Sequence, residues 1–189
     1  MVDSGHLLED WCWVLVRPDR LDWELMTESF RRWLTMDYSA HQVEWAYHGV
    51  LPRVLVEERL RGPDGGQPDE YNLFVLHGRV ELLFVDQRRY VDRHKDFYLR
   101  DWTPVDVQKG DIYPRGKPPR PRLLDRIVEV AEALGQETDF VRVDLYETGD
   151  RVVFGELTNY PSGGEKNNFT PPSYDDELGR LWTVPRRYE

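Results

Sequence analysis

Two carboxylates and one arginine in the last third of the chain have the types and spacing of a cation or anion site. Arg142 and Asp144 alternate with apolar residues in FVRVDLY, and Glu156 lies in a second alternating stretch beyond ETGD. Successive side chains of a strand point to opposite sides, so Arg142 and Asp144 share one face and the apolar residues share the other. Such a face could bind phosphate or a divalent cation.

The hairpin that these stretches predict decides whether the carboxylates meet. A three-residue turn centred on Gly149 gives expected cross-strand pairs, which are Tyr146–Val152, Asp144–Phe154 and Arg142–Glu156. Directly opposed residues point the same way, so Asp144 and Glu156 then share a face with Arg142 between them. A slip of one residue would separate the two acids. The predicted site therefore depends on the turn.

Two carboxylates on a half-buried face repel each other unless a cation lies beside them. Mg²⁺ is one candidate, because it commonly takes one or two carboxylates together with phosphate oxygens. Arg142 is the other, because it can pair with both acids without any ligand. Asn159 and the small residues of NYPSGG follow Glu156 closely, and small residues let backbone N–H groups approach an anion. This setting favours a metal-and-phosphate site.

Hydrophobic periodicity predicts the elements that must position this hairpin. In chain order they are a strand over 11–16, a helix over 21–34, a strand over 50–60, a hairpin over 71–85, a helix over 123–134, a hairpin over 140–158 and a short element over 174–181. Residues 87–117 are expected to be mostly loop, and residues 1–10 and 184–189 loose termini. This order predicts an α+β fold, an antiparallel sheet with helices packed on one face.

Composition and charge exclude several classes of protein. With 189 residues and 40% hydrophobic content, the chain is expected to form a single domain, or one domain plus a small lobe, with a real core. The net charge of −10 argues against nonspecific binding to nucleic acid or to anionic membranes. Cys12 is the only cysteine, which excludes an intrachain disulfide. No leader-like start or long apolar window occurs, so we expect a cytoplasmic protein.

The segment FVRVDLYETGDRVVFGELTNYPSGG resembles the C-terminal signature of the ATP-grasp superfamily. Within it, the sequence is most similar to the TupA-like family, which is linked to teichuronopeptide and cell-surface polymer biosynthesis. Further stretches agree in order, namely RRWLTMDY, VEWAYHGVLPRVLVEERL, DEYNLFVLHGRV, RRYVDRHKDFYLRDW and TPPSYDDELGRLW. Together they cover about residues 15–183.

The resemblance implies an ATP-grasp fold, in which two α+β lobes hold ATP between them. Such enzymes usually phosphorylate a carboxylate, here of a small molecule or polymer, to an acyl phosphate that an amine attacks. On that pattern the metal ligands are Asp144, Glu156 and Asn159, which would bind Mg²⁺ at the β- and γ-phosphates.

The same resemblance implies contacts to the nucleotide itself. Glu57 and Glu58 fall where the superfamily contacts adenine and ribose. Arg142, the candidate catalytic residue, and Arg93 would clamp the γ-phosphate or the acyl phosphate, because a guanidinium fork suits such anions.

Three departures from the family pattern concern catalysis. The superfamily usually places a phosphate-binding lysine just before a glycine-rich loop. Here 4–6 (SGH) is at most a remnant of that loop, and no lysine precedes Lys95, so most of the N-terminal lobe is expected to be missing. Asn72 stands where the family often has lysine, and Thr158 stands where the metal signature usually has asparagine.

These departures leave alternative functions open. The chain is expected to be an ATP-dependent carboxylate–amine ligase, or a relative that keeps the metal half of one. A catalytically degenerate pseudoenzyme or scaffold subunit is the second reading. A half-enzyme completed by a partner protein or by a homodimer is the third, and a misplaced start codon would give the same appearance.

Overall fold

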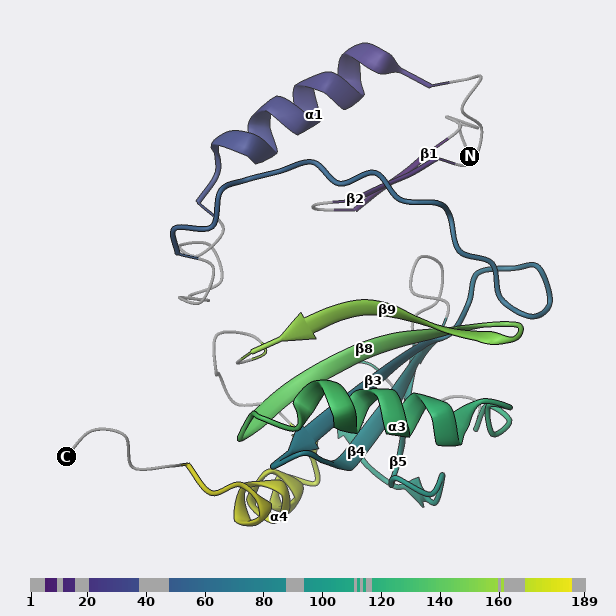
Figure 1. The fold of residues 1–189 in the computed structure, drawn as a ribbon, viewed down its shortest axis with the longest axis vertical. Coiled ribbons are helices and arrows are strands. Elements are labelled where there is room, and N and C mark those ends of the chain that lie inside the picture. The colour runs from purple at the N-terminus through teal and green to yellow at the C-terminus, as the bar shows by residue number, and fades with distance from the viewer. Residues whose placement is uncertain are drawn as a thin grey trace. The chain divides into compact units, whose positions relative to one another are not determined.

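The computed structural model describes most of the chain in two compact units, Met1–Arg59 and Leu60–Glu189 (Figure 1). The described residues are 6–9, 12–15, 21–37, 48–87, 94–110, 112, 114, 117–159, 161 and 169–184. The sequence-based expectation of a single domain stays a prediction, since one domain can contain two such units.

The first unit contains a small hairpin and a helix. Strands β1 (His6–Glu9) and β2 (Cys12–Leu15) pair antiparallel. The prediction that residues 1–10 form a loose terminus is therefore wrong for His6–Glu9. Helix α1 (Trp23–Thr35) confirms the helix predicted there. Its N-cap is Asp22, whose carboxylate accepts a hydrogen bond from Leu25 N at 3.0 Å.

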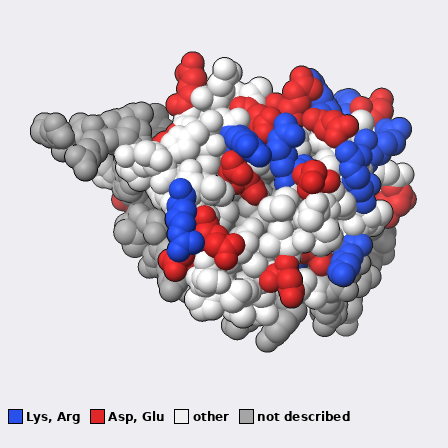
Figure 2. All heavy atoms as spheres, turned by 90° about the horizontal axis from the view of Figure 1, so that it is seen from below, with Lys and Arg blue, Asp and Glu red and all other residues white. Residues whose placement is uncertain are grey.

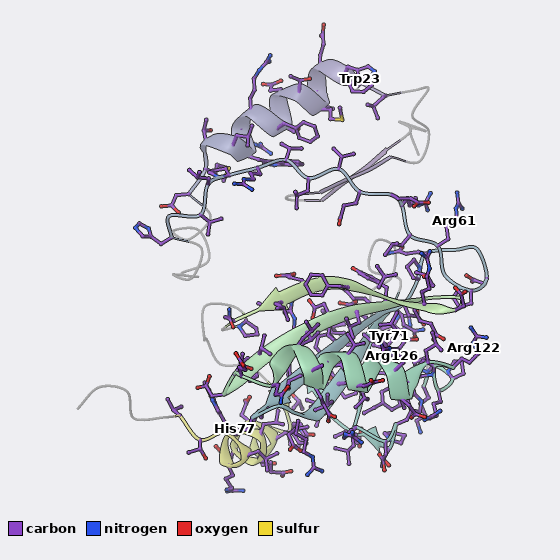
Figure 3. The ribbon with its side chains drawn as sticks, viewed as in Figure 1. Trp23, Arg61, Tyr71, His77, Arg122 and Arg126 are labelled. Atoms are coloured by element: carbon purple, nitrogen blue, oxygen red, sulfur yellow. The ribbon has the colours of Figure 1, made fainter. Side chains whose placement is uncertain are left out.

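The strand predicted over 50–60 is wrong, because the structure assigns no regular element to these residues. Their apolar side chains lie largely in solvent, with Leu55 81% and Val56 87% exposed. A buried strand needs both a ladder partner and a cover, and the part of the chain that is described supplies neither here. Trp23, at the start of α1, is likewise exposed (Figure 3).

The second unit is built on a six-stranded antiparallel sheet in the order β6-β5-β4-β3-β8-β9 (Figure 1). Its strands are β3 (Glu70–Leu76), β4 (Arg79–Gln87), β5 (His94–Tyr98), β6 (Pro104–Val105), β8 (Phe140–Thr148) and β9 (Arg151–Thr158). The α+β class and both predicted hairpins are confirmed. The β3–β4 turn has two residues, His77 and Gly78, with φ of 51° and 77°, as the twist of a tight hairpin favours.

Helix α3 (Leu124–Gly135) covers one face of this sheet. Its buried Ile127 and Ala131 pack into a core cluster with Val141, Val143 and Leu145 of β8. The predicted parity of β8 is therefore confirmed, because these apolar residues share the face beneath the helix.

Helix α4 (Ser173–Leu181) packs on the opposite face, so the expectation that helices cover one face alone is wrong. Tyr174 and Leu178 pack against a cluster that includes Phe74 and Phe97. Just beyond α4, Thr183 N donates to Nε2 of His77 at 2.9 Å (Figure 3). Helix α4 thus covers the apolar side chains on this face of the sheet, which would otherwise be exposed to water.

The stretch expected to be mostly loop contains β5, β6 and a short strand β7 (Gln108–Lys109), which pairs with β10 (Phe169–Thr170). Strand β5 (HKDFY) is fully buried despite its charged residues, because it lies between β4 and β6. Acidic and basic side chains mix on the surface seen from below (Figure 2). No helix among the described residues is long and apolar enough to cross a membrane.

Candidate functional site

The β8–β9 hairpin places Asp144 directly opposite Glu156. Near the turn the pairs are Thr148–Arg151 and Leu145–Phe154, which leaves a two-residue connection rather than the expected three. Between Asp144 and Leu145 the register shifts by one residue. The predicted pairs were therefore wrong in detail, and the predicted shared face of the two acids was right.

Two deviations from the expected hairpin cancel each other. The shorter turn alone would put Asp144 and Glu156 on opposite faces, because side-chain direction reverses with each one-residue shift. The extra residue of the β-bulge, Gly155, reverses it again. A Cβ on Gly155 would lie 2.8 Å from Cε2 of Tyr146 and 3.0 Å from the carbonyl oxygen of Asp144. Glycine therefore permits the bulge that aligns the acids.

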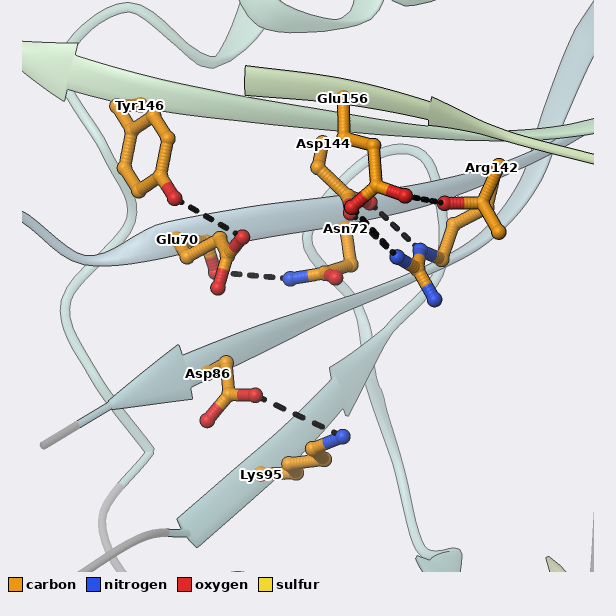
Figure 4. A network of polar contacts seen from close by, with 9 residues as sticks. Glu70, Asn72, Asp86, Lys95, Arg142, Asp144, Tyr146 and Glu156 are labelled. Atoms are coloured by element: carbon orange, nitrogen blue, oxygen red, sulfur yellow. Dashed lines mark hydrogen bonds and ion pairs between the residues drawn. The ribbon is translucent and has the colours of Figure 1, made fainter. Parts of the chain in front are cut away.

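Arg142 joins the two carboxylates (Figure 4). Its Nε donates to Oδ1 of Asp144 at 2.7 Å and its Nη2 to Oδ2 at 2.6 Å, a bidentate pair. The same Nη2 lies 3.6 Å from Oε2 of Glu156. Thr158 Oγ1 donates to the other oxygen, Oε1, at 2.9 Å. One cation thus stands between two like charges.

Burial distinguishes the two acids. The side chain of Asp144 is 2% exposed and that of Glu156 is 52% exposed. Burial raises the pKa of Asp144 from 3.8 to about 6, although the hydrogen bonds and charge of Arg142 act to lower it. Burial alone would lower the pKa of Arg142, but Asp144 raises it overall. Asp144 is therefore costly to ionise without a cation beside it.

Polar residues of strand β3 extend this face, and the sequence did not predict that they lie beside Asp144. Asn72 of β3 lies opposite Asp144, and Glu70 lies opposite Tyr146. Tyr146 donates through its hydroxyl to Oε1 of Glu70 at 3.0 Å, and Asn72 Nδ2 donates to the Glu70 carbonyl at 3.4 Å (Figure 4). The alternation of these polar residues with Tyr71 and Leu73 was the signal that could have revealed them.

A second ion pair lies further along the same face. Asp86 of β4 is opposite Glu70 and next to Lys95 of β5, whose Nζ is 3.6 Å from Oδ2 (Figure 4). The Lys95 ammonium also lies 4.6 Å from the centroid of the Phe84 ring. The sequence did not predict that Lys95 lies on this face, because β5 was expected to be loop and loop residues do not alternate between two faces.

The two carboxylates are ligands of the type that Mg²⁺ prefers, but they are too few to complete its coordination. Asp144 and Glu156 offer hard carboxylate oxygens on one face. Among the described residues no group of three or more His, Cys, Asp or Glu could hold a metal ion. A cation here would take its remaining ligands from water or from phosphate, as Mg²⁺ commonly does. Because Arg142 donates to both oxygens of Asp144, a cation bound by these two acids would also require Arg142 to move.

The structure does not test the positions of the other predicted site residues relative to this pair. Asn159 is exposed directly after β9, and in the described part of the structure no hydrogen bond joins it to either carboxylate. Glu57 and Glu58 are exposed in the irregular segment of the first unit. Arg93 lies outside the described residues. Their roles remain predictions from the sequence.

Comparison with known proteins gives one match. A family model described as TupA-like ATPgrasp matches residues 13–183, which is most of the chain. Searches of curated proteins and of solved structures find no match.

Proposed function

The chain belongs to the TupA-like ATP-grasp family, and from this premise we propose that it binds Mg–ATP on the β8–β9 hairpin and uses it to activate a carboxylate. The observation that carries the proposal is the opposed pair of Asp144 and Glu156 with Arg142 between them. Two acids brought to one face by a turn and a compensating bulge provide the hard oxygen ligands that a divalent cation takes.

Each residue has a defined task in this proposal. Asp144 and Glu156 bind the cation, with Asn159 as a further ligand from the loop after β9. Arg142 clamps the terminal phosphate, for which its planar fork is suited. Bound Mg²⁺ supplies charge neutralisation for the phosphates. Glu57 and Glu58 contact adenine and ribose, and Arg93 assists at the phosphates.

The family pattern supports the proposed reaction class. A carboxylate oxygen attacks the γ-phosphorus of ATP, ADP leaves, and an amine then displaces phosphate from the acyl phosphate to form an amide. We propose that the product belongs to cell-surface polymer or secondary-metabolite biosynthesis in the cytoplasm.

A second candidate function is an ATP-binding pseudoenzyme or scaffold subunit that needs a partner. Asn72 favours it, because this neutral residue is buried opposite Asp144, where the family often has a lysine. Hydroxylamine trapping distinguishes the two functions. An enzyme forms a hydroxamate from its acyl phosphate, and a pseudoenzyme forms none while it still binds Mg–ATP.

Calorimetric titration with Mg–ATP tests the binding site. The double variant Asp144→Asn/Glu156→Gln should lose at least about 100-fold in affinity, because loss of direct ligands should cost no less than loss of their supporting partners. Asp125→Asn/Glu129→Gln on exposed positions of α3 is the control with the same charge change and should bind as the wild type does. Unchanged affinity in the site variant would refute the assignment.

A further inference from the structure

Arg142 occupies the place that a cation would need. Both oxygens of Asp144 accept hydrogen bonds from its guanidinium, at 2.7 and 2.6 Å. Oε2 of Glu156 faces the same Nη2 at 3.6 Å, while Oε1 is held by Thr158. The guanidinium takes one acceptor site on each Asp144 oxygen and its charge repels a divalent cation, so a cation binds these oxygens favourably only when this fork moves away.

Moving Arg142 without a new partner is unfavourable. Its side chain is only 20% exposed, and a buried charge that loses its partner carries an uncompensated desolvation cost. The cation that displaces it also repels it. Arg142 therefore needs an anion within reach of its fork, and a phosphate oxygen pair matches that geometry.

We infer that Arg142 is exchanged from Asp144 to a ligand phosphate when the cation arrives, so that cation and polyphosphate bind cooperatively and neither binds well alone. This inference rests on the proposed function and adds how the site is regulated. Linkage makes the effect reciprocal, because the factor by which phosphate strengthens cation binding equals the factor by which the cation strengthens phosphate binding.

The exchange predicts effects of opposite sign from one substitution. Arg142→Met removes the competitor for Asp144, so Mn²⁺ alone should bind at least about tenfold more tightly, within the usual range of coupling factors. The same variant lacks the phosphate clamp, so Mn–ATP should bind at least about tenfold more weakly. If Arg142 had a purely structural role, the substitution would weaken the binding of Mn²⁺ alone and of Mn–ATP.

Mn²⁺ binding followed by electron paramagnetic resonance at pH 8, on the full chain with and without ATP, measures both quantities. Arg151→Met is the control, because Arg151 is exposed at the hairpin turn and pairs only loosely with Asp150 at 3.9 Å. It should leave both affinities unchanged. Arg142→Lys keeps the charge and loses the fork, so it should show the same opposite signs at smaller size.

Tighter Mn²⁺ binding together with weaker Mn–ATP binding in Arg142→Met would support the exchange. Parallel weakening of both, with Mn–ATP still bound by the wild type and lost in Asp144→Asn/Glu156→Gln, would overturn the exchange and leave the proposed function standing. If neither Arg142 variant folds, the wild type decides, since ATP must strengthen Mn²⁺ binding at least about fivefold beyond its chelation in solution. Absence of Mn–ATP binding in the wild type would overturn both the exchange and the proposed function.

Discussion

Two features of the surroundings of Asp144 shift its pKa in opposite directions. Burial favours its neutral form and Arg142 favours its charged form, and the pKa of about 6 shows that burial prevails. The sequence predicted that these two residues share a face, because strand alternation depends only on parity. It could not predict the depth of Asp144, because that depends on strand β3, which pairs with β8 although it is far away in sequence.

The raised pKa of Asp144 predicts a pH dependence of stability. The folded state holds the proton more tightly than the unfolded state, so the free energy of unfolding should fall as pH rises from about 4 to about 6. Relative to Asp144→Asn, the wild type should lose on the order of 2 kcal/mol across this window. Urea unfolding at several pH values measures the difference.

Glu132→Gln provides a control of opposite sign. Hydrogen bonds from Arg100 lower the pKa of Glu132 from 4.5, so its contribution is present above that pH and is lost on acidification. The wild type should therefore lose stability relative to Glu132→Gln as pH falls. A flat difference between wild type and Asp144→Asn would contradict the assigned environment of Asp144.

The β8–β9 hairpin shows which features of an element can be predicted from sequence. Alternating residues around ETGD predicted both strands, and the shared face of the acids was right. The two-residue turn and the bulge were missed, because Gly155 inside an alternating stretch signals a bulge only weakly. The apolar run over 50–60 has the local pattern of a strand, but the structure assigns no strand there. Strand β5 lacks such a local pattern and is a strand because it pairs with β4 and β6.

Gly155→Ala tests the role of the bulge. Its Cβ would lie too close to Tyr146 and to the carbonyl of Asp144, so unfolding free energy should fall by about 1–3 kcal/mol. Mg–ATP affinity should fall as well, because the carboxylates lose their alignment. Gly179→Ala in α4 is the control, since that Cβ meets open space and alanine favours a helix. Equal stability of the two variants would contradict a tight bulge.

At the scale of the whole molecule, the proposed cation ligands and the proposed adenine contacts lie in different units. Arg142, Asp144 and Glu156 belong to the second unit, whose sheet has a core on each face. Glu57 and Glu58 belong to the first. Local patterns predicted the hairpins and helices of the second unit because its contacts follow strand alternation and helical periodicity. In the first unit the apolar run over 50–60 predicted a strand that the structure does not contain.

The position of the bound cation is the most direct test of the central claim. With Fe²⁺ replacing Mg²⁺ in the ATP complex, added hydrogen peroxide and ascorbate generate hydroxyl radicals at the metal, and these radicals cut the nearest backbone. The cuts should fall in β8 near Asp144 and in β9 near Glu156, should require ATP, and should disappear in Asp144→Asn/Glu156→Gln. Cuts confined to other segments, or cuts in β8 and β9 that persist in the double variant, would contradict a cation site on this hairpin.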